Sequence, residues 1–215
     1  MKRTLLVLLW ALASLAATAE AQIYFSLNGG YALSTNKLNG GGIGFGGTVG
    51  LELTPSFSLE LAVRNWSVPV TGSNQGLSEG KYSALPIELS GRLRLPVGTR
   101  FTLSGEVGAG FALQSFRLDE TLAADWASVG FLIEESVENS LAVHIGLGLE
   151  FALSPTIALD FGARYHYLRS QGTWTITDIA GGESQTGQIA DLDFGAITFS
   201  LGIRISLLGK SPDLR

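Results

Sequence analysis

The sequence predicts an all-β fold, an eight-stranded antiparallel up-and-down barrel that crosses a membrane with its strands. Long stretches alternate apolar with small or polar residues, which is the period of a β-strand. Eight such stretches occur, and the connections between them alternate between long and short. After the N-terminal segment no apolar run reaches about 18 residues, the length expected of a helical membrane span.

The N-terminal segment is typical of a secretory signal peptide. A positive start is followed by an apolar run from Leu5 to Ala17 and by Ala19-Glu20-Ala21, which has the A-x-A form of a cleavage site. The expected division of the chain is a signal peptide at 1–21, a membrane barrel at 22–208 and a short periplasmic tail at 209–215.

The composition narrows the class of protein. The chain has 215 residues, a formal net charge of -5 and no cysteine. An exported domain without cysteines cannot be held by disulfides, so backbone hydrogen bonds and packing must hold it. A negative net charge argues against a nucleic-acid partner.

The clearest pattern is a hairpin of two long strands joined by Ser154-Pro155-Thr156. From Leu141 to Leu153 and from Ile157 to Tyr167 every odd position is apolar, while the even positions hold glycine, alanine, charged residues and histidine. A strand with two such different faces separates two different environments.

The other strands repeat this pattern. In chain order the eight expected strands are 23–33, 43–53, 57–64, 85–95, 101–114, 141–153, 157–167 and 191–205. Short turns are expected at 54–56, 96–99 and 154–156, and longer loops at 34–41, 66–81, 115–139 and 168–188. The last strand begins out of phase at 191–194, which predicts a β-bulge near Gly195-Ala196.

The apolar face is expected to point outward into lipid. A soluble barrel with an apolar interior, such as a lipocalin, would also alternate. However, the even face has almost no lysine and is rich in small residues, which suits a narrow lumen, and the odd face carries no charge in mid-strand. Two aromatic girdles are expected, with Phe25, Phe57, Phe101 and Phe151 at the short-turn end and Tyr31, Trp66, Tyr82, Tyr165 and Tyr167 at the long-loop end.

With that orientation, six acids, five arginines and both histidines point into the lumen. Buried charges must be paired, so we expect a salt-bridge network that closes the lumen. The alternative is a narrow passive pore for small solutes. The expected network consists of Glu52, Glu60, Arg64, Glu88, Arg92, Arg94, Glu106, His144, Glu150, Asp160, Arg164, His166 and Arg204.

Three segments resemble the small outer-membrane β-barrel family that includes the OmpA transmembrane domain, OmpX-like proteins and opacity-type surface antigens. They are residues 24–33, 159–168 and the final strand at 200–207, which ends on Leu207 where that family usually has an aromatic residue. The resemblance implies an integral protein of the bacterial outer membrane, in contact with outer-membrane lipids and lipopolysaccharide and assembled by the barrel-assembly machinery.

Catalysis is not expected. His166, Asp191 and Asp193, with Ser170 just above, could gather at the rim as an acid–base or metal site, but no compact catalytic or metal motif is present. No metal or cofactor is therefore expected, and a lipid-modifying enzyme ranks below both a structural or surface-interaction role and a pore.

The long loops are the expected place for partner binding. Loop 115–139 is acidic and also unusually apolar, which leaves two interpretations. The loop either packs as a short helix or strand extension, or presents a contact surface, together with loop 168–188, to an extracellular partner. The apolar residues in question are Leu122, Trp126, Val129, Phe131, Leu132 and Ile133.

Overall fold

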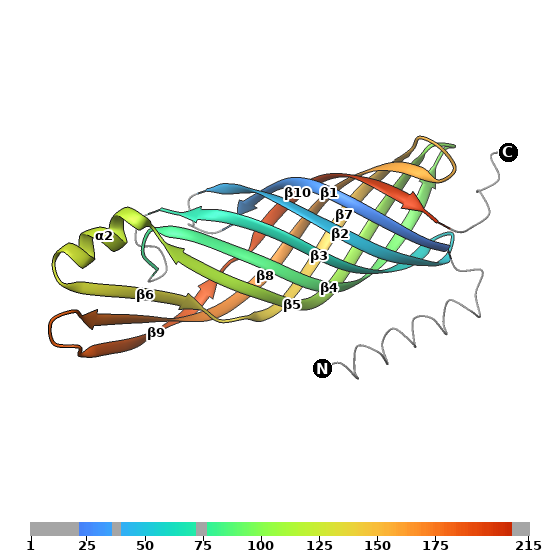
Figure 1. The fold of residues 1–215 in the computed structure, drawn as a ribbon. Coiled ribbons are helices and arrows are strands. Elements are labelled where there is room, and N and C mark those ends of the chain that lie inside the picture. Colours follow the sequence, from blue (N-terminus) through green and yellow to red (C-terminus); the bar gives the residue numbers. More distant parts are fainter. Residues whose placement is uncertain (1–21, 36–39, 72–76, 208–215) are drawn as a thin grey trace.

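A computed structural model describes residues 22–35, 40–71 and 77–207. The expected signal peptide (1–21) and periplasmic tail (209–215) lie outside these residues. Eight antiparallel strands close into a ring, and each pairs with its neighbour around the circle (Figure 1). The ring consists of β1 (Gln22–Ser34), β2 (Gly41–Thr54), β3 (Phe57–Val70), β4 (Gly80–Val97), β5 (Phe101–Leu118), β7 (Ser140–Ala152), β8 (Ile157–Asp178) and β10 (Ala196–Ser206).

The first and last strands close the ring. β1 pairs with β10 in a continuous register from Tyr24 opposite Ser206 to Ser34 opposite Ala196. Closure leaves no unpaired strand edge in the ring, which is what lets a β-sheet lie in hydrocarbon without exposing backbone polar groups. The predicted fold class, an eight-stranded antiparallel barrel, is confirmed.

The strands at the long-loop end are longer than predicted. β3 reaches Val70 and β4 begins at Gly80, inside the expected loop 66–81. The expected loop 115–139 contains the end of β5, the helix α2 (Glu120–Ser128) and the strand β6 (Phe131–Val137). The expected loop 168–188 is largely β8 and the strand β9 (Ser184–Asp193). These segments expose acidic and apolar side chains together, and they keep backbone pairing with one another.

β6, β9 and the outer part of β8 (172–178) form a three-stranded sheet that rises beyond one side of the barrel, here called the apical sheet (Figure 1). β8 lies in its centre, with Phe131 of β6 opposite Asp178 and Ser184 of β9 opposite Thr177. The adjoining α2 is capped by Asp119, whose carboxylate accepts hydrogen bonds from the N–H groups of Thr121 and Leu122. None of the helices in the described ranges is both long and apolar enough to cross a membrane.

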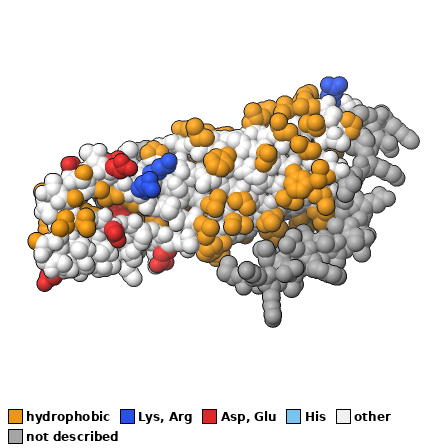
Figure 2. Space-filling view, in the orientation of Figure 1, with side chains coloured by type: hydrophobic (Ala, Val, Ile, Leu, Met, Phe, Trp, Pro, Cys, Tyr) orange, Lys and Arg blue, Asp and Glu red, His pale blue; other side chains and the backbone are white. Residues whose placement is uncertain are grey.

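The odd positions of the barrel strands point outward, as predicted. Leu27, Ile43 and Leu147 are each more than 70% exposed, while the charged even positions are buried. Figure 2 shows hydrophobic side chains spread over the barrel wall. Acidic side chains gather at the end of the molecule that carries α2 and the apical sheet. A continuous apolar outer wall around the barrel is the surface that a lipid bilayer requires.

The girdle prediction was wrong for two residues. Trp66 and Tyr82 point into the barrel and are almost completely buried, because both occupy even positions. Phe25, Tyr31 and Phe101 do lie on the outer face, as do Tyr165 and Tyr167. The periodicity of the strand thus decides orientation more reliably than the preference of aromatic residues for interfaces.

The pairing is interrupted at 194–195, beside the bulge expected near Gly195-Ala196, and a second irregularity lies earlier in the chain. The register of β8 with β9 shifts between Ser170 and Gly172, opposite Asp191, whose φ is 56°. The chain then leaves the sheet at Phe194 and re-enters it as β10. Leu192 and Phe194 remain on the interior side, so their unusual phase reflects an apolar interior at this level rather than a reversal of faces.

We expect Leu147→Arg, near the middle of the lipid-facing belt, to lower the free energy of unfolding in lipid vesicles by about 2–4 kcal/mol. The matched control is Leu132→Arg on the apical sheet, also an exposed leucine, where water solvates the new charge and the cost should be near zero. Equilibrium unfolding in urea measures both. Equal costs at the two positions would contradict the assignment of the outer face to lipid.

Candidate functional site

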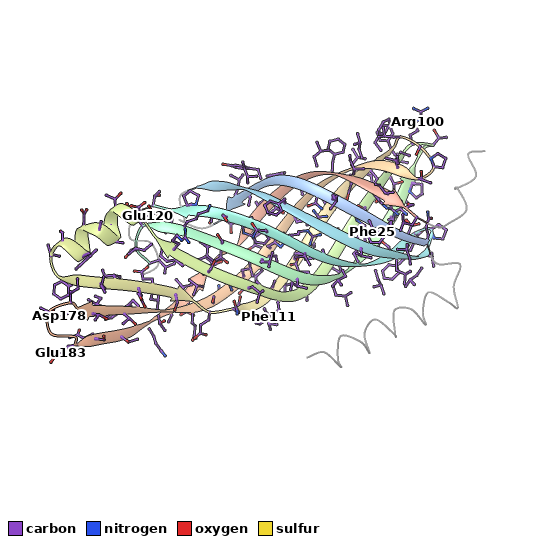
Figure 3. All side chains as sticks on the ribbon, in the orientation of Figure 1. Phe25, Arg100, Phe111, Glu120, Asp178 and Glu183 are labelled. Carbon is purple, nitrogen blue, oxygen red and sulfur yellow. The ribbon has the colours of Figure 1, made fainter. Side chains whose placement is uncertain are left out.

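The interior of the barrel is filled by two layers, one polar and one apolar. Even-numbered residues of all eight strands point inward, and the strand register fixes their heights. Charged side chains occupy the half nearer the short turns, and apolar side chains occupy the half nearer the long loops. Figure 3 shows the side chains along the whole barrel, with Arg100 at the short-turn end and Asp178 and Glu183 at the far tip of the apical sheet.

The lowest part of the polar layer is a closed ring of two arginines and two glutamates. Arg94 and Arg204 each bind both Glu52 and Glu150. The N–O distances to Glu150 are 2.8 Å from Arg94 and 2.6 Å from Arg204. These residues come from β2, β4, β7 and β10, so the ring joins strands from opposite sides of the barrel.

Arg92 occupies the centre of the polar layer. Its guanidinium lies 3.2 Å from Glu60, 3.3 Å from Glu106 and 3.4 Å from both Glu150 and Asp160. A single cation thus serves four buried carboxylates, which repel one another without it. Among the described side chains, no other arginine pairs with so many acids.

Tyr24 completes this layer. Its hydroxyl donates a 2.5 Å hydrogen bond to Glu60, and its ring lies 3.9 Å from the Arg204 guanidinium carbon. Sequence reasoning left Tyr24 out of the network. Its even position in the first strand could have predicted that the side chain points into the lumen. Gly50 makes room for it, since a β-carbon there would lie 2.0 Å from the tyrosine ring.

The upper part of the polar layer contains both histidines. Arg164 binds Glu106, and Arg64 binds Oε2 of Glu88 at 2.8 Å. The other oxygen of Glu88, Oε1, lies 3.0 Å from Nδ1 of His144 and 3.4 Å from Nδ1 of His166. All thirteen residues expected in the lumen therefore lie in the interior, and each has at least one partner from that set.

The second candidate grouping is not formed. His166 is completely buried, and its Nε2 lies 3.3 Å from the Thr198 hydroxyl rather than beside an aspartate. Ser170 donates its hydroxyl hydrogen to the backbone carbonyl of Glu138. Asp191 is exposed, and Asp193 accepts a hydrogen bond from the Gly195 N–H. A serine–histidine–aspartate relay requires contacts that differ from these.

The apolar layer lies above the network and was not predicted. Tyr82 stacks on Phe194 with ring centroids 3.8 Å apart, and its hydroxyl donates to Gln114 at 2.6 Å. Trp66 lies against His166, at 4.7 Å between centroids, where the two layers meet. The layer consists of Ala32, Trp66, Val68, Val70, Leu77, Tyr82, Ala84, Ala112, Val137, Ala142, Leu168, Ile189, Leu192 and Phe194.

We expect Arg92→Met to cost about 3–5 kcal/mol of unfolding free energy, because it leaves four buried carboxylates without their shared cation. Arg100→Met, at an exposed arginine of a short turn, is the matched control and should be nearly neutral. Denaturant unfolding of the refolded barrels measures the difference. Equal stability of the two variants would show that Arg92 does not stabilise the network.

The architecture matches known outer-membrane barrels. OprG from Pseudomonas aeruginosa superposes with a TM-score of 0.60 at 16% identity, covering 86% of this chain and 95% of its own. Neisserial surface protein A gives a TM-score of 0.55 at 13% identity, and the match covers 88% of this chain and 98% of that protein. The outer membrane protein AlkL gives a TM-score of 0.50 at 15% identity, and the match covers 92% of this chain and 94% of that protein. At these identities the likeness shows the fold alone.

The sequence itself identifies the family. A comparison with curated proteins found no match. The family model described as outer membrane protein beta-barrel domain matches residues 4–204, which is most of the chain. The closed ring of eight strands, its apolar outer wall and this match agree. The chain is an integral protein of the bacterial outer membrane and belongs to the outer membrane protein beta-barrel domain family.

Proposed function

We propose that this protein is a non-conducting outer-membrane barrel that holds its apical sheet outside the cell for contact with a partner. The observation that carries this proposal is a group of exposed apolar side chains on α2, β6 and the adjoining turns. Barrels of this kind have short periplasmic turns and longer extracellular loops, which supports an extracellular location for the apical sheet. Large apolar side chains exposed together in water mark contact surfaces.

This surface, here called the apical patch, combines apolar and acidic groups. Trp126 and Phe131 lie edge to face, 6.4 Å between ring centroids, and both remain more than a third exposed. Forming a helix and a strand has therefore not buried these side chains, so the two interpretations of loop 115–139 do not exclude each other. The patch consists of Trp126, Val129, Phe131 and Ile179, whereas the exposed Leu132 points to the opposite face of β6.

Acidic side chains belong to the same elements as the patch. Glu120 begins α2, and Asp178 and Glu183 lie at the tip of the β8–β9 hairpin (Figure 3). Asp125 and Glu134 come from α2 and β6. An apolar surface with acidic surroundings is complementary to a partner that has both apolar and basic groups. We therefore infer a basic, amphipathic extracellular partner.

The filled interior supports a scaffold rather than a pore. The arginine–carboxylate contacts cross the polar layer from several sides, and the apolar layer fills the interior above it. A hydrated path through the barrel would have to separate ion pairs in the first layer and open packed aromatic rings in the second. Both rearrangements carry a substantial free-energy cost.

Two further partners follow from the proposed role. The outer leaflet brings lipopolysaccharide phosphates near the acidic apical sheet, where divalent cations would bridge the two. The final strand β10, which closes the ring against β1, is the segment that we propose the barrel-assembly machinery handles during insertion.

A basic amphipathic helical peptide should bind the wild-type barrel in zwitterionic nanodiscs, as measured by fluorescence anisotropy. Trp126→Ser with Phe131→Ser should weaken binding by about tenfold, because loss of an aromatic anchor at an interface costs more than about 1 kcal/mol. Higher salt should also weaken it. Gln185→Ala, on the exposed strand β9, is the control. Binding that neither the double variant nor salt reduces would contradict the proposed surface.

In planar bilayers we expect no steady ohmic current through the folded wild-type barrel, because both interior layers are filled. Heat-modifiable migration on gels confirms folding of the same preparation. Phe199→Ala, on the outer face, serves as the control and should also be silent. A steady current whose size scales linearly with voltage would overturn the non-conducting assignment and favour the passive pore.

A further inference from the structure

The two histidines and Glu88 form a separate cluster where the polar and apolar layers meet. They come from β4, β7 and β8, and each is at most 1% exposed. Gly108 of β5 lies beside His144, and a β-carbon there would lie 2.4 Å from the His144 ring. Sequence spacing does not indicate this cluster, because the three residues are far apart in the chain and form no metal motif.

Three donor atoms of this cluster converge on one point. Glu88 Oε1 lies 3.0 Å from His144 Nδ1 and 3.4 Å from His166 Nδ1, and one donor atom from each residue lies within 4.8 Å of the others. A tetrahedral zinc ion with bonds of about 2.0–2.2 Å holds its ligands roughly 3.3–3.6 Å apart. The two contacts of Glu88 are close to this spacing, and the three donor atoms lie no more than 4.8 Å apart.

Each of the three side chains also has a polar partner on the side that faces away from the cluster. Nε2 of His144 lies 3.3 Å from the Ser90 hydroxyl, and Nε2 of His166 lies 3.3 Å from the Thr198 hydroxyl. Arg64 binds Oε2 of Glu88, the oxygen that faces away from the histidines. Outer partners of this kind fix the orientation of metal ligands. They leave Nδ1, Nδ1 and Oε1 directed at the same point.

One of these donors lacks a hydrogen bond. Nδ1 of His166 is buried and makes none with the described residues, since its approach to Glu88 at 3.4 Å does not have hydrogen-bond geometry. Buried polar atoms in folded proteins nearly always have a partner. This unpaired ring nitrogen lies beside a carboxylate and a second imidazole, so it is available to bind a cation.

We propose that Glu88, His144 and His166 bind one divalent transition-metal ion, with zinc the best fit to two imidazoles and one carboxylate. Calcium and magnesium are disfavoured because they require more oxygen ligands than the cluster offers. On binding, Nδ1 of each imidazole carries the ion in place of a proton, and Nε2–H donates to Ser90 or Thr198. The ion joins three strands beneath the apolar layer, which shields it from solutes, so its role is structural.

The test uses the full barrel without a polyhistidine tag, because a tag would itself bind metal. It is refolded in detergent with zinc or cobalt present, or exposed to the metal after folding, since a buried site fills most readily before the barrel closes. Metal content is measured after dialysis, and affinity is followed by the visible absorption of cobalt. We expect one ion per barrel in wild type and at least tenfold weaker binding in His144→Gln, His166→Gln and Glu88→Gln.

Two controls distinguish this site from other acids. Glu60→Gln removes a buried carboxylate outside the cluster, and Asp125→Asn removes an acid on α2; both should bind metal as wild type does. X-ray absorption of the metal-loaded wild type should show imidazole ligands, and this measurement does not depend on any variant folding. A shell of oxygen ligands alone, undiminished binding in His144→Gln with His166→Gln, or wild type without stoichiometric metal under both loading conditions would each overturn the proposal.

Discussion

The narrow interior of the closed barrel is the constraint on which the rest of the structure depends. Once eight strands close into a ring, every inward side chain must find its partner inside the protein. Charges in such a space are stable only when they are paired. Arg92, shared by four carboxylates, and the ring of Arg94, Arg204, Glu52 and Glu150 meet this requirement. The network ties together strands that share no backbone hydrogen bonds.

The same confinement explains the small residues of the interior. A large side chain on one strand needs space opposite it, and glycine provides that space. Gly50 lies against Tyr24 and Gly108 against His144. These two glycines are therefore complements of a buried tyrosine and a buried histidine, and packing rather than backbone flexibility accounts for them.

The barrel interior and the apical sheet lie in different environments: the interior is enclosed by the barrel wall, and the apical sheet is exposed to water. Within the lipid belt, charged side chains point inward and pair with one another there. Beyond the belt, water solvates both faces, so β6, β8 and β9 continue as a sheet whose polar residues are exposed. The apolar side chains of the apical patch are unusual in that setting, and this is why we infer that they contact a partner. The rigid barrel below holds them at a fixed position above the membrane.

The amino-acid sequence determined the strand number, the outward face and the set of charged residues in the lumen. Each depends on the two-residue period of a strand and on the cost of a charge in lipid, which are local properties. Only the tertiary structure decided which charges meet, because pairing across the barrel depends on register and height. It also revealed the inward position of Trp66 and Tyr82, the apolar layer and the apical sheet. Glu88, His144 and His166 converge for the same reason: closure of the ring brings together side chains that sequence spacing keeps apart.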